Sequence, residues 1–251
     1  MTKRTLFITG GSTGIGAAAV RKFHAEGWNV AFMDINDEAG KALADELPGV
    51  RFMHGSTCVK SDIFDAVAQT VQAFGGLDCV VPNAGIHRCN TVLDITDEEL
   101  DLMIDTNIKG TVNTLRAGVP HLRRGGSVVI NASDQSYIGK PHSFAYGMTK
   151  GAIGQIAKSM AIDLGPSGIR VNAVCAATIR TPLVDKLFKR FAEVDAGGDV
   201  EAYWNAEAAM YPLGRVGEPE EVAELIYFLA SEKASFITGG LYLIDGGLVA
   251  K

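Results

Sequence analysis

Three residues in the middle of the chain have the types and spacing needed for proton transfer. Tyr146 and Lys150 are four positions apart, so on a helix they would share one face about one turn apart. A free tyrosine has a pKa near ~10, and a neighbouring ammonium would lower that pKa by favouring the phenolate. Ser133 could orient an oxygen between them. The set suits proton transfer to or from an alcohol, although the tyrosine–lysine spacing alone occurs on many solvated helices.

A glycine-rich stretch near the N-terminus suits dinucleotide binding. An expected strand runs into Thr9-Gly10-Gly11-Ser12-Thr13-Gly14-Ile15-Gly16. Glycines let the backbone turn tightly and approach a ligand, and the helix that follows offers free N–H groups to a pyrophosphate. The spacing differs from GxGxxG, and a plain strand–helix turn is the simpler alternative. The strand before, the helix after and an acidic residue beyond favour nucleotide binding.

The acidic residue is Asp34, at the end of the second expected strand. Its carboxylate can accept both ribose hydroxyls of adenosine and would repel a 2′-phosphate. Neither Thr13 nor Ile35 provides an arginine for such a phosphate. The sequence therefore predicts NAD rather than NADP. Asp34 could instead only cap the next helix, but Asn36 is the better-placed N-cap.

Short apolar runs alternate with longer helical segments along the whole chain, without linker or repeat. The expected strands are Thr5–Thr9, Asn29–Asp34, Val50–Met53, Cys79–Val81, Ser127–Asn131, Arg170–Cys175 and Leu241–Ile244. The expected helices are Gly14–Glu26, Asp37–Leu47, Asp62–Phe74, Asp97–Arg123, Ser143–Leu164 and Pro219–Ala230. This alternation predicts a single α/β domain over 1–251. We expect a Rossmann-type doubly wound parallel sheet of about seven strands, with helices on both faces.

Composition excludes several other classes of protein. A net charge of −6 without a Lys/Arg cluster argues against nucleic-acid binding. No run approaches the ~20 apolar residues of a membrane span, and the N-terminal apolar run is too short for a signal peptide. The cysteines, Cys58, Cys79, Cys89 and Cys175, lack zinc-site spacing. We therefore expect reduced thiols, no metal and a cytoplasmic location.

Further motifs occur in order along the chain and carry a family resemblance. They are Asn83-Ala84-Gly85, Asn107, Ser133, Tyr146 with Lys150, Asn172 and Asp245-Gly246-Gly247. With Thr9–Gly16, which resembles a TGxxxGxG loop, they make nearly the whole sequence similar to the short-chain dehydrogenase/reductase (SDR) family. Each motif is weak alone, but their number and consistent spacing make the resemblance specific.

The resemblance implies a role for each matching residue. Ser133 would orient the substrate oxygen, Tyr146 would be the general acid or base, and Lys150 would hold the nicotinamide ribose. Asn107 would hold a water that links Lys150 to solvent, and the protein would be a homotetramer built on its two long helices and C-terminal strand. The implied cofactor site comprises Gly10, Ser12, Thr13, Gly14, Ile15, Gly16, Asp34, Cys58, Val59, Asn83, Ala84, Gly85, Tyr146, Lys150, Ile179 and Thr181.

Three positions depart from the family pattern. Cys58, before Val59, stands where the family usually has the aspartate that contacts adenine, and a thiol is a weak acceptor. Pro82 replaces the first asparagine of an NNAG element, and at a strand end we expect only a local change. Ala176-Ala177 replaces Pro-Gly, which predicts a differently shaped loop beside the nicotinamide.

Residues for substrate binding are harder to identify. The candidates are His87, Arg88, Ser133, Gln135, His142 and Tyr146, with Arg180 nearby. The cationic ones could meet a carboxylate or several hydroxyls, which suggests a hydroxy acid, sugar or sugar acid. Solvated loop residues are an equally good interpretation of most of them. The segment 183–211 resembles two short helices, either a substrate lid or a fixed subunit contact.

These features favour an NAD-dependent secondary-alcohol dehydrogenase or ketone reductase. A 3-ketoacyl-thioester reductase is the first alternative, but Asp34 counts against it because that role generally uses NADPH. A non-catalytic NAD-binding regulatory protein is the second, and the presence of Ser133, Tyr146 and Lys150 counts against it. A purely structural or interaction protein has no supporting feature.

Overall fold

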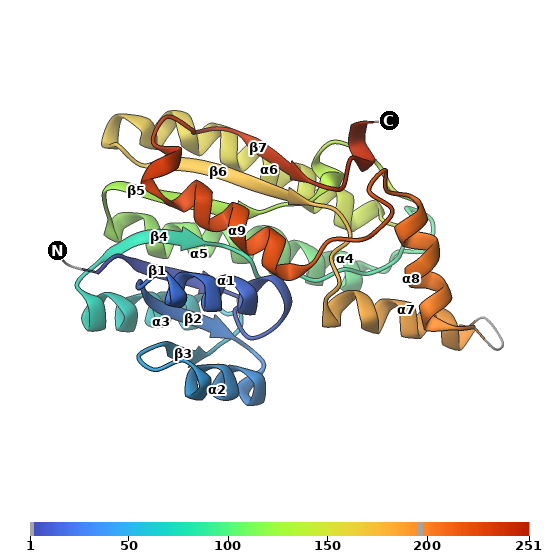
Figure 1. Cartoon of the computed structure of the whole chain (residues 1–251), viewed down its shortest axis with the longest axis horizontal. Helices are drawn as coiled ribbons and strands as arrows, with labels where there is room; N and C mark the ends of the chain where they lie inside the picture. The colour runs from blue at the N-terminus through green and yellow to red at the C-terminus, as the bar shows by residue number, and fades with distance from the viewer. Residues whose placement is uncertain (1–2, 195–197, 251) are drawn as a thin grey trace.

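A seven-stranded parallel sheet forms the centre of the computed structural model, which describes residues 3–194 and 198–250 (Figure 1). The strand order is β3-β2-β1-β4-β5-β6-β7. The strands are β1 (Thr5–Thr9), β2 (Asn29–Asp34), β3 (Arg51–His54), β4 (Leu77–Val81), β5 (Leu122–Asn131), β6 (Arg170–Ala176) and β7 (Leu241–Ile244). The order reverses direction between β1 and β4, so a crevice lies beyond the carboxyl ends of these strands.

Helices cover both faces of the sheet (Figure 1). One layer holds α1 (Gly14–Ala25), α2 (Asp37–Glu46) and α9 (Pro219–Ala230), and the other holds α3 (Lys60–Phe74), α5 (Gly110–Gly118) and α6 (Phe144–Leu164). Successive β1 side chains point to opposite faces, with Leu6 and Ile8 in one core and Phe7 in the other. The predicted α/β fold is therefore confirmed.

One predicted helix is divided into several pieces. Instead of one helix over Asp97–Arg123, the chain forms α4 (Asp97–Met103), a π-helical turn (Ile104–Lys109), α5, and a 3₁₀ turn (Val119–His121). Pro120 lies in that last turn, and a proline cannot continue the helical hydrogen-bond ladder. As a result β5 starts at Leu122 rather than Ser127.

A helix pair, α7 (Pro182–Val194) and α8 (Val200–Ala209), projects beyond one end of the sheet (Figure 1). It has a hydrophobic cluster of its own, centred on Phe188, Trp204, Tyr211 and Val216. Single 3₁₀ turns cover Asp134–Ser136, Gly165–Ser167, Glu232–Ala234 and Leu248–Ala250. Among the described helices, none is both long and apolar enough to cross a bilayer.

Two local predictions are confirmed by the structure. Asn36 caps α2, because its side-chain oxygen accepts a hydrogen bond from the Ala39 N–H at 3.1 Å. All four cysteines are free thiols, and Cys79 and Cys175 are buried in β4 and β6.

Candidate active site

The glycine-rich loop between β1 and α1 has a backbone that larger residues could not adopt. Gly10 and Gly14 have φ values of +67° and +53°. A Cβ on Gly16 would lie 1.9 Å from the Gly10 carbonyl oxygen. Thr13 is the N-cap of α1, but its side chain makes no capping hydrogen bond. The first-turn N–H groups are thus left for a ligand, as a pyrophosphate site requires.

Asp34 is fixed beside this loop by two backbone groups. Its Oδ2 accepts the Ser12 N–H at 3.0 Å, and its Oδ1 accepts the Asn36 N–H at 2.9 Å. Each carboxylate oxygen can still accept a further hydrogen bond, for example from a ribose hydroxyl. Asp34 therefore orders the loop, while the side chain of Asn36 caps α2 as predicted.

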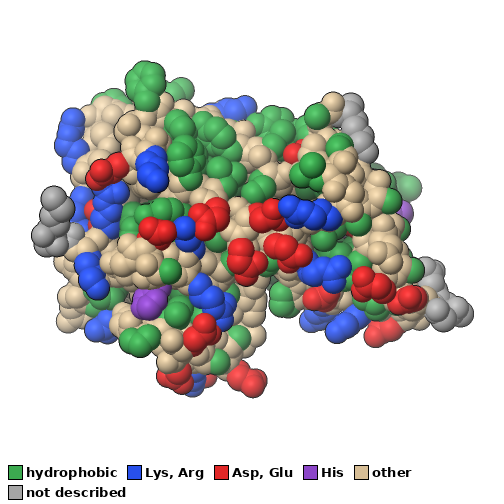
Figure 2. All heavy atoms as spheres, in the orientation of Figure 1, with side chains coloured by type: hydrophobic (Ala, Val, Ile, Leu, Met, Phe, Trp, Pro, Cys, Tyr) green, Lys and Arg blue, Asp and Glu red, His purple; other side chains and the backbone are tan. Residues whose placement is uncertain are grey.

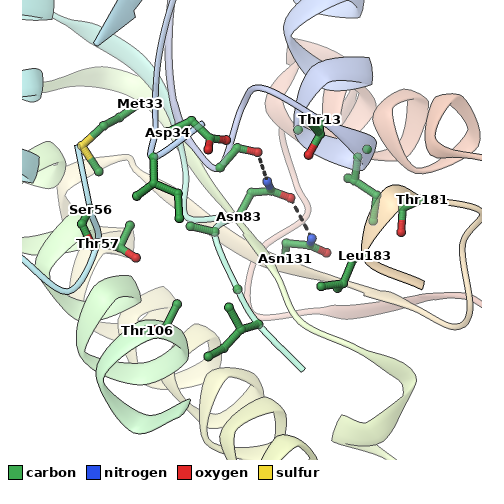
Figure 3. Close-up of a pocket in the computed structure, with 18 of the residues that line it drawn as sticks. Thr13, Met33, Asp34, Ser56, Thr57, Asn83, Thr106, Asn131, Thr181 and Leu183 are labelled. Carbon is green, nitrogen blue, oxygen red and sulfur yellow. Dashed lines mark hydrogen bonds between the residues drawn. The ribbon is translucent and has the colours of Figure 1, made fainter. Parts of the chain in front are cut away.

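A large cavity of about 490 Å³ runs along these groups (Figure 3). Figure 3 shows Asp34 and Ser56 on one side, Thr13 and Thr181 on the other, and Asn83 between them. The residues predicted for the cofactor that line it are Gly10, Thr13, Gly14, Ile15, Gly16, Asp34, Cys58, Asn83, Ala84, Gly85 and Thr181. These residues fit a dinucleotide, because the glycines leave room for the pyrophosphate and Asp34 for the ribose.

Asn83 ties the loop to the strand ends. Its Nδ2 donates to the carbonyl oxygens of Thr9 at 3.1 Å and Gly10 at 2.8 Å, and its Oδ1 accepts from Asn131 Nδ2 at 2.8 Å (Figure 3). Pro82 ends the strand before it, and its carbonyl oxygen accepts the Asn131 N–H at 3.0 Å. Pro82 thus lies directly after β4, at the strand end where a proline is tolerated.

A small cavity of about 120 Å³ adjoins the large one and reaches the predicted catalytic pair. Both cavities share the lining residues Ile15, Asn83, Gly85, Asn131, Thr181 and Leu183. The small one adds Ala132, Tyr146, Lys150, Ala176, Ala177, Ile179 and Val184. The shared lining means that a ligand held by the glycine loop can extend to Tyr146.

Tyr146, Lys150 and Ser133 come together at this end of the cleft. Lys150 is buried, and its Nζ donates to the Asn131 carbonyl oxygen at 2.8 Å. The same Nζ lies 5.5 Å from the centroid of the Tyr146 ring. The buried Ser133 hydroxyl lies close enough to the Tyr146 side chain to lower the pKa of Tyr146. Residues from the end of β5 and from α6 thus form one polar group, as the sequence predicts.

The direction predicted for the Tyr146 pKa is wrong for the protein alone. Burial raises the pKa of Tyr146 to about 12; the Ser133 hydrogen bond lowers it, and the Asp134 charge raises it. Burial also lowers the pKa of Lys150 to about 8. Desolvation sets the direction, because the Lys150 Nζ bonds to a carbonyl oxygen and stays 5.5 Å from the Tyr146 ring centroid.

Asn107 lies in the π-helical turn and clamps the loop after β4. Its Oδ1 accepts the Ile86 N–H at 2.8 Å. Its Nδ2 donates to the Ile86 carbonyl oxygen at 3.0 Å and to Thr149 Oγ1 on α6 at 3.1 Å. Asn107 therefore holds the end of the Asn83–Gly85 element against the helix that carries Tyr146 and Lys150.

The predicted substrate residues separate into two groups. The His87 ring packs edge-on against the Tyr146 ring, 4.5 Å between centroids, and burial lowers the pKa of His87 to about 4. Arg88 lines the large cavity, where its Nη1 donates to the His87 carbonyl oxygen at 3.2 Å. Of the described residues, Gln135 and His142 lie outside the linings of both cavities. Of the described candidates only Arg88 and Tyr146 line a cavity, whereas His87 and Ser133 adjoin the site through their contacts with Tyr146.

Two further predicted residues are engaged elsewhere. The Arg180 guanidinium stacks 4.4 Å from the Trp204 ring centroid and so joins the loop after β6 to α8. Val59 is the N-cap of α3 and lies outside the linings of both cavities in the described chain. Cys58 does line the large cavity, with its Sγ 3.3 Å from Thr106 Oγ1. A thiol–hydroxyl pair therefore stands where the family has a carboxylate.

Sequence reasoning missed several lining residues. The main ones are Thr57, Leu102, Thr106 and Asn131. Asn131 could have been found from its place at the end of an expected strand, where parallel strands present ligand-binding groups. Its Oδ1 is buried without a partner among the described residues, so it is available to a ligand. Thr106 belongs to the π-helical turn and Leu102 to the end of α4 just before it, and the sequence has no clear signal for that turn.

Comparison with known proteins agrees with this geometry. A family model described as "Enoyl-(Acyl carrier protein) reductase" matches residues 10–249. L-fucose dehydrogenase of Mus musculus is 37% identical over 246 residues, which cover 97% of this chain and 88% of the relative. Aldohexose dehydrogenase of Thermoplasma acidophilum, in ligand-free form, has a TM-score of 0.90 at 31% identity and covers 100% of this chain and 95% of its own.

A second solved structure carries the family in its name. A short chain dehydrogenase family protein from Francisella tularensis has a TM-score of 0.89 at 34% identity, with 100% of both chains covered. The family implies a nicotinamide cofactor, NAD or NADP. The chain belongs to the short-chain dehydrogenase/reductase family and is an oxidoreductase of that type.

Proposed function

We propose that this protein is an NAD-dependent dehydrogenase that interconverts a secondary alcohol and a ketone. One observation carries the proposal: Tyr146 and Lys150 line the small cavity that joins the dinucleotide cleft, and the Ser133 hydroxyl lies beside Tyr146. A hydride acceptor held by the glycine loop would reach a substrate oxygen that these hydroxyls contact. This arrangement brings hydride transfer and proton transfer to one carbon–oxygen bond.

The protein's own residues would handle the substrate oxygen and its proton. Bound NAD would supply the hydride chemistry. Ser133 orients the substrate oxygen, and Tyr146 takes the alcohol proton or returns one to the alkoxide. Lys150 holds the nicotinamide ribose. Burial favours the protonated form of Tyr146, whereas the positive charges of Lys150 and of the bound nicotinamide would favour the phenolate. Asn107 holds the water through which Lys150 exchanges protons with solvent.

The preference for NAD rests on Asp34. Among the described residues that line the large cavity, only Asp34 and Arg88 carry a charge. Arg88 belongs to the loop after β4, whereas Asp34 ends β2 beside Ile35. A 2′-phosphate at the end of β2 would meet the Asp34 carboxylate, and the neighbouring residue there, Ile35, provides no compensating positive charge. This argues against NADP.

The substrate class that fits best is a polyhydroxylated molecule, a sugar or sugar acid, with other hydroxy acids next. Arg88 can bind a carboxylate or hydroxyls, and the neutral His87 can hydrogen-bond a hydroxyl beside Tyr146. Arg180 is engaged with Trp204. The relatives named for L-fucose and aldohexose support a sugar.

Two alternative functions are less well supported. Reduction of a 3-ketoacyl thioester would usually draw on NADPH, which Asp34 disfavours. A regulatory NAD-binding protein would not need a buried Ser133 and a buried, hydrogen-bonded Lys150 beside Tyr146. If the protein binds NAD but shows no dehydrogenase activity with any substrate tested, the regulatory alternative would be favoured.

The helix pair and the surface suggest further properties. The first turn of α7 lines both cavities through Leu183, which suits a substrate lid over 183–211, a range of which 195–197 lie outside the described residues. The edge strand β7 and helix α6 expose Leu243, Phe144 and Ile162, which supports a homotetramer built on these elements. In Figure 2, hydrophobic side chains gather in the upper part of the view, above a region where acidic and basic side chains alternate. We place the protein in the cytoplasm because its four thiols are free.

A screen of activity in both reaction directions tests the proposed function. The purified protein is assayed for NAD reduction with sugars, sugar acids, other hydroxy acids, polyols and simple secondary alcohols, and for NADH oxidation with a 3-ketoacyl thioester. We expect NAD-linked turnover with a polyhydroxylated substrate, and less with NADP. Turnover with the thioester alone, driven by NADPH, would replace this proposal by the reductase alternative.

A further inference from the structure

A buried carboxylate adjoins the catalytic hydroxyls. Asp134 follows Ser133 directly and is 1% exposed. The Ser133 Oγ donates to Asp134 Oδ1 at 2.8 Å, and the same Oγ accepts the Gln135 N–H at 3.2 Å. Asp134 lies outside the linings of both cavities among the described residues, so its carboxylate acts on the site through Ser133.

Lys140 balances this carboxylate from the other side. Its Nζ lies 2.7 Å from Asp134 Oδ2, and its side chain is only 23% exposed. The segment between them turns back through a 3₁₀ turn, with the N–H groups of Tyr137 and Ile138 bonded to the Asp134 carbonyl oxygen at 2.8 and 3.1 Å. The pair is therefore locally ordered. Because both side chains are largely shielded, their charges are weakly screened by solvent.

One proton on Ser133 has two competing acceptors. When Tyr146 is neutral, it can donate to Ser133 Oγ while Ser133 donates to Asp134, so the hydroxyls form one directed chain. When Tyr146 is a phenolate, Ser133 must turn its proton away from Asp134 to stabilise it. Two negative groups then share one donor. Asp134 thus opposes ionisation of Tyr146, and Lys140 reduces that opposition.

We propose that the Asp134–Lys140 pair positions the Ser133 proton and so sets how readily Tyr146 gives up or takes its own. This proposal rests on the proposed function, in which Tyr146 is the acid or base. Asp134 and Lys140 are positioning residues, since neither lines the ligand cavities in the described chain.

Other charged and titratable groups surround the same hydroxyls. The loop after β4 contributes His87 and Arg88, and β6 contributes Cys175. Lys150 comes from the same helix as Tyr146. Burial of Tyr146 is the main cause of its raised pKa, and the Asp134 charge adds to it. Among these described groups, Asp134 is the one whose charge is coupled to Tyr146 through a shared hydroxyl.

Tyrosine NMR tests the proposal without a substrate. The whole protein is labelled with [¹³Cζ]tyrosine, and Tyr146→Phe identifies the Tyr146 signal among six tyrosines. In Asp134→Asn the amide oxygen can still accept the Ser133 proton, but the charge is gone. We expect the Tyr146 pKa to fall by about one unit. Lys140→Met should shift it upward, seen as less phenolate near pH ~11.

A matched variant controls for net charge. Glu46→Gln removes one carboxylate charge from an exposed pair with Arg21, 2.7 Å between charged atoms, and should leave Tyr146 unchanged. The pH limb of kcat/KM for alcohol oxidation should move in the same two directions as the NMR titration. A merely structural role for the pair would not produce shifts of opposite sign.

The outcomes separate this proposal from the proposed function. No shift in Asp134→Asn, or shifts of the same sign in both variants, would overturn the role of the pair even if turnover is normal. Opposite shifts without any hydride transfer would support the pair and refute the dehydrogenase. If Asp134→Asn does not fold, the upward shift in Lys140→Met decides the matter, since its absence contradicts the proposal.

Discussion

The two sides of the cleft are built by different means. On the dinucleotide side, the backbone makes the site: Gly16 is pressed against the Gly10 carbonyl, and Asp34 is held by two N–H groups. On the substrate side, the helix pair α7–α8 packs around its own side chains, centred on Phe188 and Trp204. The glycine loop tolerates few residue types, whereas a packed cluster such as that of α7 and α8 can form from many combinations of apolar side chains.

The anchoring of the helix pair shows the same contrast. Thr178 Oγ1 donates to Glu207 at 2.5 Å, and the Tyr211 hydroxyl donates to the same carboxylate oxygen at 3.0 Å. Arg180 stacks on Trp204 from the same loop. These side-chain contacts join α8 to the loop after β6. The helix pair is therefore held by side-chain packing, whereas the glycine loop is held by backbone geometry.

Changing Asp34 should have the largest effect on the dinucleotide side. Asp34→Ala removes charge-assisted hydrogen bonds to the ribose, each worth about 1.5–3 kcal/mol, so the NAD-over-NADP ratio in kcat/KM should fall by about a hundredfold. Asp37→Ala on the exposed start of α2 is the matched control and should leave the ratio as it is. An unchanged ratio in Asp34→Ala would mean that Asp34 does not contact the ribose.

Changing Arg88 should have a smaller effect on the substrate side. Arg88→Ala should raise KM by about tenfold for sugar acids and other hydroxy acids, because a charge-assisted bond to a carboxylate is lost. Neutral polyols should change less. Arg116→Ala, on the exposed face of α5, serves as the control for lost charge. Equal effects on acids and neutral polyols would contradict the role of Arg88 as an anion ligand.

How far the sequence predicted each side follows from this difference. Strands, the glycine loop and the positions of Tyr146 and Lys150 depend on local patterns, so they could be predicted, although β5 begins at Leu122 rather than the expected Ser127. The π-helical turn that brings Thr106 into the site depends on tertiary packing and has no local signature. The pKa of Tyr146 is raised because the side chain is buried, and burial cannot be deduced from the spacing of Tyr146 and Lys150 in the sequence. His142 lies in a loop outside the described linings of both cavities, which its place in the sequence does not reveal.

Trp204→Ala should affect the substrate side alone. The side chain is 2% exposed and packs 4.7 Å from the Phe188 ring centroid, so its loss should loosen the helix pair locally. We expect a several-fold rise in substrate KM, faster amide exchange in α7 and α8, and unchanged NADH binding. Trp28→Ala, in the main core against Phe23, should instead lower Tm without changing KM. Weakened NADH binding in Trp204→Ala would show that the two sides are not separate.

Lys150→Met should reveal the cost of burying the catalytic ammonium. The folded-state pKa of about 8 is below the unfolded value near 10.5, so the unfolded chain binds more protons between these values and wild-type stability rises with pH there. At pH ~7 the variant should melt a few degrees higher, and the difference should shrink toward pH ~10. The exposed Lys158→Met should show neither effect. A difference in Tm independent of pH would contradict the burial argument.

The most direct measurement of the central claim is the turnover of Tyr146→Phe alongside its NADH affinity. The variant keeps the ring that packs 4.5 Å from His87 and removes only the hydroxyl. With the best alcohol from the screen, we expect kcat to fall by about a thousandfold or more while the Kd for NADH stays within about twofold. Near-normal turnover in Tyr146→Phe would contradict the assignment of Tyr146 as the general acid or base.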